Sequence, residues 1–146
     1  MANEQYAFLK SSCVPTRDQW QQAIDCVGFD LKLDLKFEPR TNVGFVPCKL
    51  NGAESGVEMY FDDSTEFMGT FRAIAAERDC CISFRWASSI EEAACAMIAS
   101  FALASEYDAV VSFEGESPYE KLADFRRDTD AMLKFAANGI LPRRRT

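Results

Sequence analysis

The spacing of apolar and polar positions along the chain predicts three helices, and each begins with the same local signal. A hydroxyl residue is followed three positions later by Gln or Glu, the capping-box spacing that satisfies free backbone N–H groups at a helix start. The three pairs are Thr16 with Gln19, Ser89 with Glu92, and Ser117 with Glu120.

The residues that follow these pairs predict how each helix packs. The first helix, over 16–27, has its apolar residues on one face and ends at Gly28, which suits a left-handed cap. The second has little polar surface, so we expect it to be the central, mostly buried helix. The third has Pro118 at its first helical position and ends at Asn138 and Gly139.

Alternation with a period of two predicts strands between the helices. The clearest strand is 31–37, where leucines and a phenylalanine alternate with charged residues. The pair Asn51-Gly52 favours a tight hairpin turn, although residues 53–56 suggest a bulge or a longer loop. A short helix around 64–75 is also indicated. The expected strands cover 31–37, 44–50, 57–61, 80–86 and 109–113.

The order of these elements predicts an α+β fold. The strand, helix and strand between 80 and 113 require two parallel strands joined by a right-handed crossover, whereas the earlier strands form an antiparallel meander. We therefore expect a single domain over 1–146, with a mixed, mostly antiparallel sheet of about five strands and three main helices packed against it. Residues 139–146 are expected to be a frayed basic tail.

The composition and the missing motifs exclude several kinds of catalytic and metal-binding site. None of the 146 residues is histidine, so Ser-His-Asp and Cys-His catalysis and imidazole metal sites are excluded. The Gly-rich phosphate-binding loops, the Gly-x-Ser-x-Gly nucleophile motif and the Asp-rich calcium-loop spacing are also absent. We therefore expect no catalytic residue, no metal and no cofactor.

The net charge of −7 indicates the class of partner. A negatively charged protein repels phosphate backbones, so we expect no nucleic-acid ligand. The charge favours a basic protein as the partner. The alternative is that the acidic residues only keep the protein soluble. No apolar run is long enough to cross a membrane and the N-terminus has no signal-peptide pattern, so we expect a cytoplasmic protein. The six cysteines show no Cys-x-x-Cys pair and are expected to be buried thiols.

Two groups of acidic residues are the candidate binding sites. The first is the more interesting because its five acids occur without an intervening basic residue, and two tyrosines of the kind that interfaces favour lie among them. Local capping and helix-dipole effects also favour carboxylates at such positions, and this explanation is favoured over a binding role. The first group is Glu106, Tyr107, Asp108, Glu114, Glu116, Tyr119 and Glu120. The second is Glu54, Glu58, Asp62, Asp63 and Glu66.

Four segments carry a resemblance to small bacterial proteins that look like immunity partners of toxin systems, and the likeness as a whole extends over about two thirds of the chain. These segments run from Pro15 to Ile24, from Gly28 to Leu31, from Gly44 to Gly56 and from Ile82 to Trp86. The resemblance implies a non-enzymatic protein that binds a cognate toxin and blocks it, and it implies no particular site residues. The alternatives are a structural or regulatory interaction protein without a toxin partner, and a small-molecule-binding or carboxylate-dependent hydrolytic domain.

Overall fold

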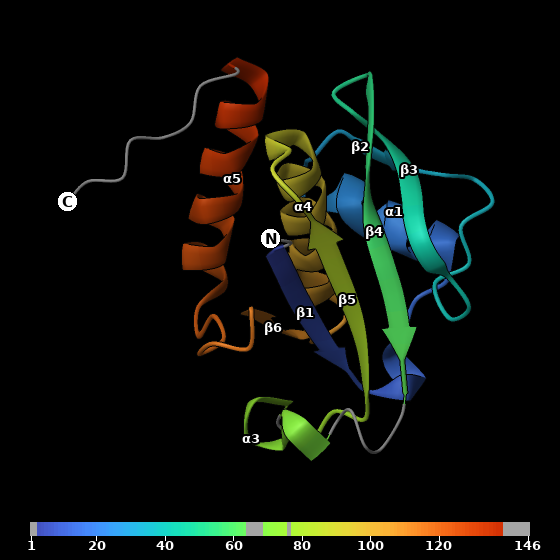
Figure 1. The fold of residues 1–146 in the computed structure, drawn as a ribbon, viewed down its shortest axis with the longest axis vertical. Helices are drawn as coiled ribbons and strands as arrows, with labels where there is room; N and C mark the ends of the chain where they lie inside the picture. The colour runs from blue at the N-terminus through green and yellow to red at the C-terminus, as the bar shows by residue number, and fades with distance from the viewer. Residues whose placement is uncertain (1–2, 64–68, 76, 139–146) are drawn as a thin grey trace.

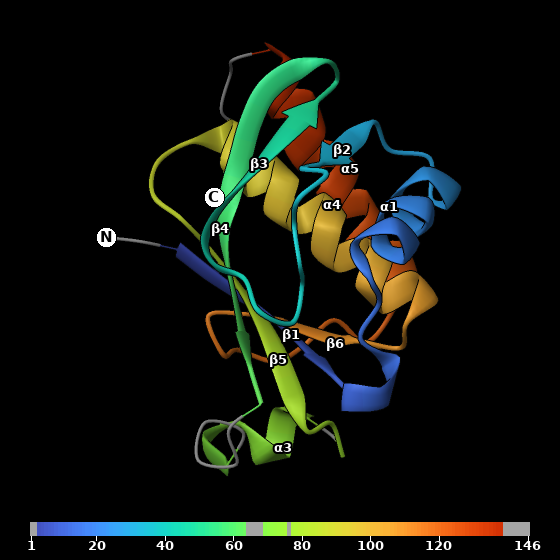
Figure 2. The same cartoon turned by 90° about the vertical axis from the view of Figure 1, so that its right-hand side faces the viewer.

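The protein folds as one antiparallel sheet with its main helices on one side (Figures 1 and 2). The structure, a computed structural model, describes residues 3–63, 69–75 and 77–138. The strands lie in the order β2-β3-β4-β5-β1-β6. Their bounds are β1 Asn3–Leu9, β2 Leu31–Leu33, β3 Val43–Leu50, β4 Ala53–Asp62, β5 Cys80–Trp86 and β6 Val110–Phe113.

Three main helices cover one face of the sheet. They are α1 Arg17–Cys26, α4 Ile90–Glu106 and α5 Leu122–Asn138. A single 3₁₀ turn, Ser11–Cys13, precedes α1, and the short helix α3, Arg72–Ala75, lies at one end of the opposite face. The predicted α+β class is therefore confirmed. Residues 64–68 of the predicted short helix and the predicted frayed tail, 139–146, lie outside the described residues.

The central strand β1 was not predicted from the sequence. It pairs with β5 along its whole length and with β6 through Gln5–Phe8, always antiparallel. Its apolar residues do not alternate, because this part of the sheet is covered on both faces: Ala7 and Leu9 join the main core, and Phe8 packs with Ala75 of α3. A strand buried on both faces lacks the period-two signal.

The insertion of β1 changes the strand neighbours that the sequence suggested. Because β1 is antiparallel to both β5 and β6, those two strands run parallel, as the strand-helix-strand pattern predicts. They are not adjacent, however, since β1 lies between them. Every pairing in the described sheet is consequently antiparallel.

The hairpin β3–β4 has the tight turn that Asn51-Gly52 favours. Leu50 pairs directly with Ala53, and both turn residues have positive φ, 50° at Asn51 and 84° at Gly52. Such a pair of left-handed residues matches the twist of an antiparallel hairpin. The alternative of a longer loop over 53–56 is wrong, because these residues continue β4.

The strand predicted over 31–37 ends at Leu33. The chain turns at Asp34, whose carbonyl oxygen accepts a hydrogen bond from the Phe37 amide at 3.1 Å. Leu35 is consequently 82% exposed, whereas Phe37 is buried. The outer edge of β2 is closed by Gln21 of α1, which accepts from the Leu33 amide and donates to the Leu31 carbonyl oxygen, both at 2.8 Å. This side chain thus replaces a neighbouring strand.

The helix starts are confirmed for α1 and α4 but not for α5. Thr16 and Gln19 form a reciprocal capping box, and the Ser89 hydroxyl accepts from the Glu92 amide at 3.2 Å. Residues 117–121, in contrast, are not helical, and α5 begins at Leu122. The Tyr119 amide donates instead to the Val111 carbonyl oxygen at 3.3 Å, so this segment remains beside β6.

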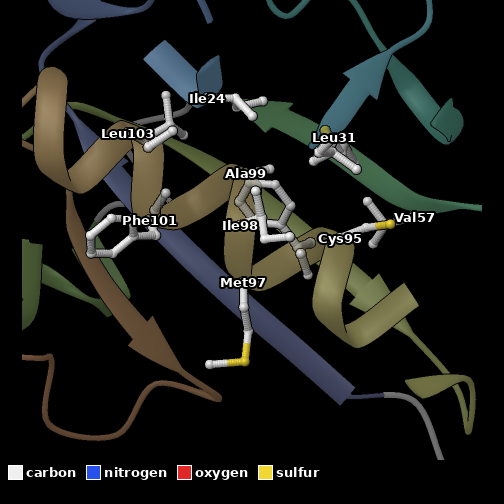
Figure 3. Close-up of a cluster of buried hydrophobic side chains, with 14 of the residues drawn as sticks. Ile24, Leu31, Val57, Cys95, Met97, Ile98, Ala99, Phe101 and Leu103 are labelled. Carbon is white, nitrogen blue, oxygen red and sulfur yellow. The ribbon is translucent and has the colours of Figure 1, made fainter. Parts of the chain in front are cut away.

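The main core lies between the sheet and the helices, with α4 at its centre (Figure 3). Every residue of α4 from Ala93 to Leu103 is buried, as predicted for the central helix. Trp20 of α1 is fully buried and donates its indole N–H to the Ala99 carbonyl oxygen at 3.0 Å. α5 packs along α4, so it forms an outer layer on the helical side.

Candidate functional site

The first predicted acidic group is divided by β6. Glu106 and Asp108 precede this strand, whereas Glu114, Glu116 and Glu120 follow it. The two ends of this four-residue strand are about 10 Å apart, so the acids that precede it are at least that far from the acids that follow it. These carboxylates therefore do not form one continuous patch.

Asp108 is also neutralised by a base that is distant in the sequence. Arg78 places Nη2 at 3.0 Å from the Asp108 carboxylate and donates to the Asp108 carbonyl oxygen at 2.7 Å. The five acids of the first group have no basic residue between them in the sequence, but this pattern contains no information about basic residues that are close in space. The fold brings a compensating charge from a segment 30 residues away.

The two tyrosines of the first group are held by internal contacts. Tyr119 stacks on Phe125 with ring centroids 4.3 Å apart and donates to Asp128 Oδ2 at 2.9 Å. Burial, together with this bond to a carboxylate, raises the Tyr119 pKa. Tyr107 packs partly against the core and donates to the Gln19 carbonyl oxygen at 3.4 Å. Both side chains thus contribute to folding.

The remaining acids of the first group lie near the start of α5. Glu114 follows β6 in a turn with φ 52°, and its amide donates to the Glu4 carbonyl oxygen at 2.9 Å. Glu116 and Glu120 are exposed. Glu116 also lines a groove beside α5, which is described below.

Most of the second predicted group lies on the sheet face away from the main helices. Glu54, Glu58 and Asp62 are separated by even numbers of residues along β4, so their side chains share that face, and Asp63 follows directly after the strand. Glu66 lies outside the described residues. The strand register brings these acids beside residues of β1, β3 and β5 that the sequence analysis did not select.

We call this surface the open sheet face. It is the part of the sheet that neither the main helices nor α3 covers in Figure 2. One cross-strand row contains Glu4, Arg85, Glu58 and Phe45, and the next contains Tyr6, Ser83, Tyr60 and Val43.

In the middle of the open sheet face, a row of charged side chains lies next to a row that contains two tyrosines. Arg85 lies between Glu4 and Glu58 in the register, with its Nε 4.0 Å from Glu4 Oε1. Tyr60 donates to Glu58 Oε1 at 2.6 Å, and Tyr6 donates to Glu4. The bond to Glu58 raises the pKa of Tyr60, while burial and then the bond to Glu4 raise that of Tyr6. Both phenols therefore stay protonated as donors at neutral pH.

Exposed apolar side chains border these polar groups. Val43 is 79% exposed and Phe45 is 54% exposed, both on β3. The Phe45 ring lies over Gly56 of the neighbouring strand, where a Cβ atom would collide with it. Aromatic and aliphatic side chains left in water on a sheet face mark a surface suited to a partner.

Five residues of the open sheet face were not predicted from the sequence as site residues: Glu4, Tyr6, Val43, Phe45 and Arg85. Glu4 and Tyr6 were missed because β1 itself was not predicted. Val43 and Phe45 alternate with Gly44 and Val46, so the period-two pattern indicated a shared face but not which face is exposed. That choice depends on where α4 packs.

Most of the cysteines are buried, and none of the six forms a disulfide. All six are free, and Cys48, Cys80, Cys81 and Cys95 are buried as predicted, whereas Cys13 is half-buried and Cys26 is exposed. Cys80 faces the main core and Cys81 the cluster around Phe8. Burial raises the pKa of Cys80 to about 11, which disfavours the nucleophilic thiolate.

Within the described ranges, no set of three or more Cys, Asp or Glu side chains is arranged to hold a metal ion. The same residues include no helix that is long and apolar enough to span a membrane. No known protein family matches this chain, and neither a curated protein nor a solved structure matches it. The resemblance to immunity proteins therefore stays a prediction.

Proposed function

We propose that this protein is a non-enzymatic binding protein that captures a basic protein on its open sheet face. The observation that carries the proposal is the presence of exposed Val43 and Phe45 beside Glu4 and Glu58 on one uncovered surface. Apolar side chains gain free energy when a partner displaces their water, and carboxylates favour a cationic partner.

The local charge supports a basic partner. The charged row of the open sheet face has two carboxylates, Glu4 and Glu58, and one guanidinium, Arg85. Asp62 lies farther along β4, beside Cys81. The whole chain adds a long-range field of the same sign, with a net charge of −7. Such a field speeds the encounter with a cationic protein.

The specific form that we propose is an immunity-type inhibitor, acting in the cytoplasm on a cognate bacterial toxin. The resemblance noted above and the lack of histidine support this form. The toxin's cationic substrate groove would be covered by the carboxylates of the open sheet face. A regulatory protein with a harmless basic partner would use the same surface, so the two forms differ in the partner's toxicity.

A matched pair of variants tests the surface. Phe45→Ser removes the central apolar contact, whereas Leu35→Ser removes a more exposed apolar residue in the turn after β2. The tagged wild-type protein and both variants are incubated with native lysate, and the captured proteins are released by increasing salt. We expect Phe45→Ser to retain the basic protein at least about fivefold more weakly than wild type and Leu35→Ser, since a central aromatic contributes more than about 1 kcal/mol.

Equal retention by the two variants would remove the open sheet face from the proposal. The gene of the captured protein is then expressed with and without this chain. Growth arrest that the wild-type chain relieves supports the immunity form. A harmless partner supports the regulatory form instead.

A further inference from the structure

A second surface, separate from the open sheet face, is a groove on the helical side of the protein. It lies between α5 and the ends of β1, β5 and β6, and has a volume of about 880 Å³. We call it the α5 groove. Its volume is within the range of roughly 300–1,000 Å³ that small-molecule sites have.

The walls of the α5 groove are mainly apolar. Trp86 and Met97 are 7% and 8% exposed, so they form its deeper part, and the rings of Trp86 and Phe113 lie 6.2 Å apart. Met132 and Phe135 line it from α5. Figure 3 shows Met97 pointing away from the side of α4 on which Leu31 and Val57 lie, in accordance with its place in this groove.

A buried polar group in the α5 groove has an unused acceptor. Gln5 is 3% exposed, and its Nε2 donates to Ser100 Oγ at 2.6 Å. The Ser100 hydroxyl donates to the Ala96 carbonyl oxygen at 2.7 Å and can therefore only accept from Gln5, which fixes the orientation of the amide. No donor in the described part of the chain reaches Gln5 Oε1. An acceptor left without a donor in the lining of a groove favours a ligand that brings an N–H group.

The charged groups of the α5 groove favour the same kind of ligand. Its two charged lining residues are acids, the exposed Glu116 and the half-buried Asp128, and the described lining contains neither lysine nor arginine. Asp128 already accepts from Tyr119, so Glu116 is the carboxylate most available to a ligand. The described lining therefore offers no cationic side chain to an anion, whereas it offers the Glu116 carboxylate to a cation.

We propose that the α5 groove binds a small amphiphilic cation, with an apolar body against Trp86, Met97 and Phe113 and an N–H-bearing cationic end among Gln5 Oε1 and the groove acids. The apolar walls provide affinity, and the acceptors provide selectivity by charge. Because the residues involved face the helices, the site is independent of the partner surface on the opposite face of the sheet.

Three compounds that differ only at one end test the proposal: phenylbutylamine, phenylbutanol and phenylbutanoate. Each is titrated into the ¹⁵N-labelled protein while amide chemical shifts are followed by NMR. We expect saturable shifts at the groove residues, with affinity highest for the amine and lowest for the carboxylate. Shifts confined to the open sheet face, equal affinity for the amine and the carboxylate, or no saturable binding of any compound would overturn the proposal.

Three variants separate groove binding from nonspecific adsorption. Ala131→Trp fills the groove from an exposed position of α5, and Ala123→Trp places the same side chain at an exposed position of α5 outside the lining. We expect the first to abolish binding and the second to preserve it. Glu116→Gln should weaken the amine roughly two- to fivefold, the range for an exposed ion pair, and leave the alcohol unchanged. Amine binding that survives Ala131→Trp contradicts the site.

Discussion

Gly56 shows how a single residue shapes the open sheet face. A Cβ atom at this position would lie 2.5 Å from the Val46 carbonyl oxygen and closer still to the Phe45 ring. The missing side chain lets the aromatic ring cover the neighbouring strand, with the rest of the ring left in water. The exposed position of Phe45 on β3 thus depends on a glycine on β4.

Gly56→Ala should therefore destabilise the fold by about 1–3 kcal/mol, the usual cost of an inserted methyl group in a tight contact. Phe45→Ala in the same background should restore only part of this loss, because the Val46 carbonyl oxygen still opposes the new methyl group. Urea unfolding measures both values. Gly69→Ala is the control, since its Cβ would meet nothing within 4 Å. Wild-type stability in Gly56→Ala would contradict the steric argument.

At the scale of elements, the three capping pairs have different outcomes although their sequences are alike. Two of them begin helices with the expected bonds, from Gln19 N to Thr16 Oγ1 and from Glu92 N to Ser89 Oγ, both at 3.2 Å. The third pair, Ser117 with Glu120, does not begin a helix. Tyr119, which lies between them, bonds to β6 through its amide and stacks on Phe125. A local signal decides the structure where no tertiary contact competes with it.

Alanine variants test this difference between the capping pairs. Thr16→Ala and Ser89→Ala should each lower the free energy of unfolding by about 1 kcal/mol, because each leaves a helix-start amide without its acceptor. Ser117→Ala should change it by less than about 0.5 kcal/mol, because this residue does not cap α5. Chemical denaturation compares the three. An equal loss in Ser117→Ala would show that α5 begins where the sequence alone predicts.

At the scale of the whole molecule, packing on both faces of β5 buries two thiols, Cys80 on the side of the main core and Cys81 on the side of Phe8 and α3. Burial raises the pKa of Cys80 from its ordinary value of 9.0 to about 11, with the Asp79 charge adding to the effect. It also raises the pKa of Cys81. Above pH 9 the unfolded chain loses these protons while the folded chain retains them, so stability decreases as pH rises.

We therefore expect the free energy of unfolding to fall between pH 9 and pH 11. Replacing Cys80 by alanine should make this slope shallower by up to about 1.4 kcal/mol per pH unit, the contribution of one proton. Ile82→Val, on the same face of β5, is a control that perturbs the core without removing a titrating group. Denaturant unfolding at several pH values measures each slope. A slope in Cys80→Ala equal to that of wild type would contradict the role of this thiol.

The candidate site was predictable only in part, and particular residues show why. Glu58 and Asp62 were selected from the sequence because acids near a turn are visible there. Arg85 and Glu4 were not, because they meet Glu58 only through a register that joins β4, β5 and β1 across most of the chain. Asp108 was wrongly interpreted as an unpaired acid, because its partner Arg78 is close in space but distant in the sequence.

The sequence by itself determined what short-range interactions control: the starts of α1 and α4, the Asn51-Gly52 turn, the buried character of α4 and the α+β class. These depend on hydrogen bonds and periodicities within a few residues. Only the tertiary structure decided that β1 is central, that residues 117–121 are not helical, which sheet face is open and which acids are neutralised. Those outcomes depend on contacts between distant segments, whose free energies outweigh local preference.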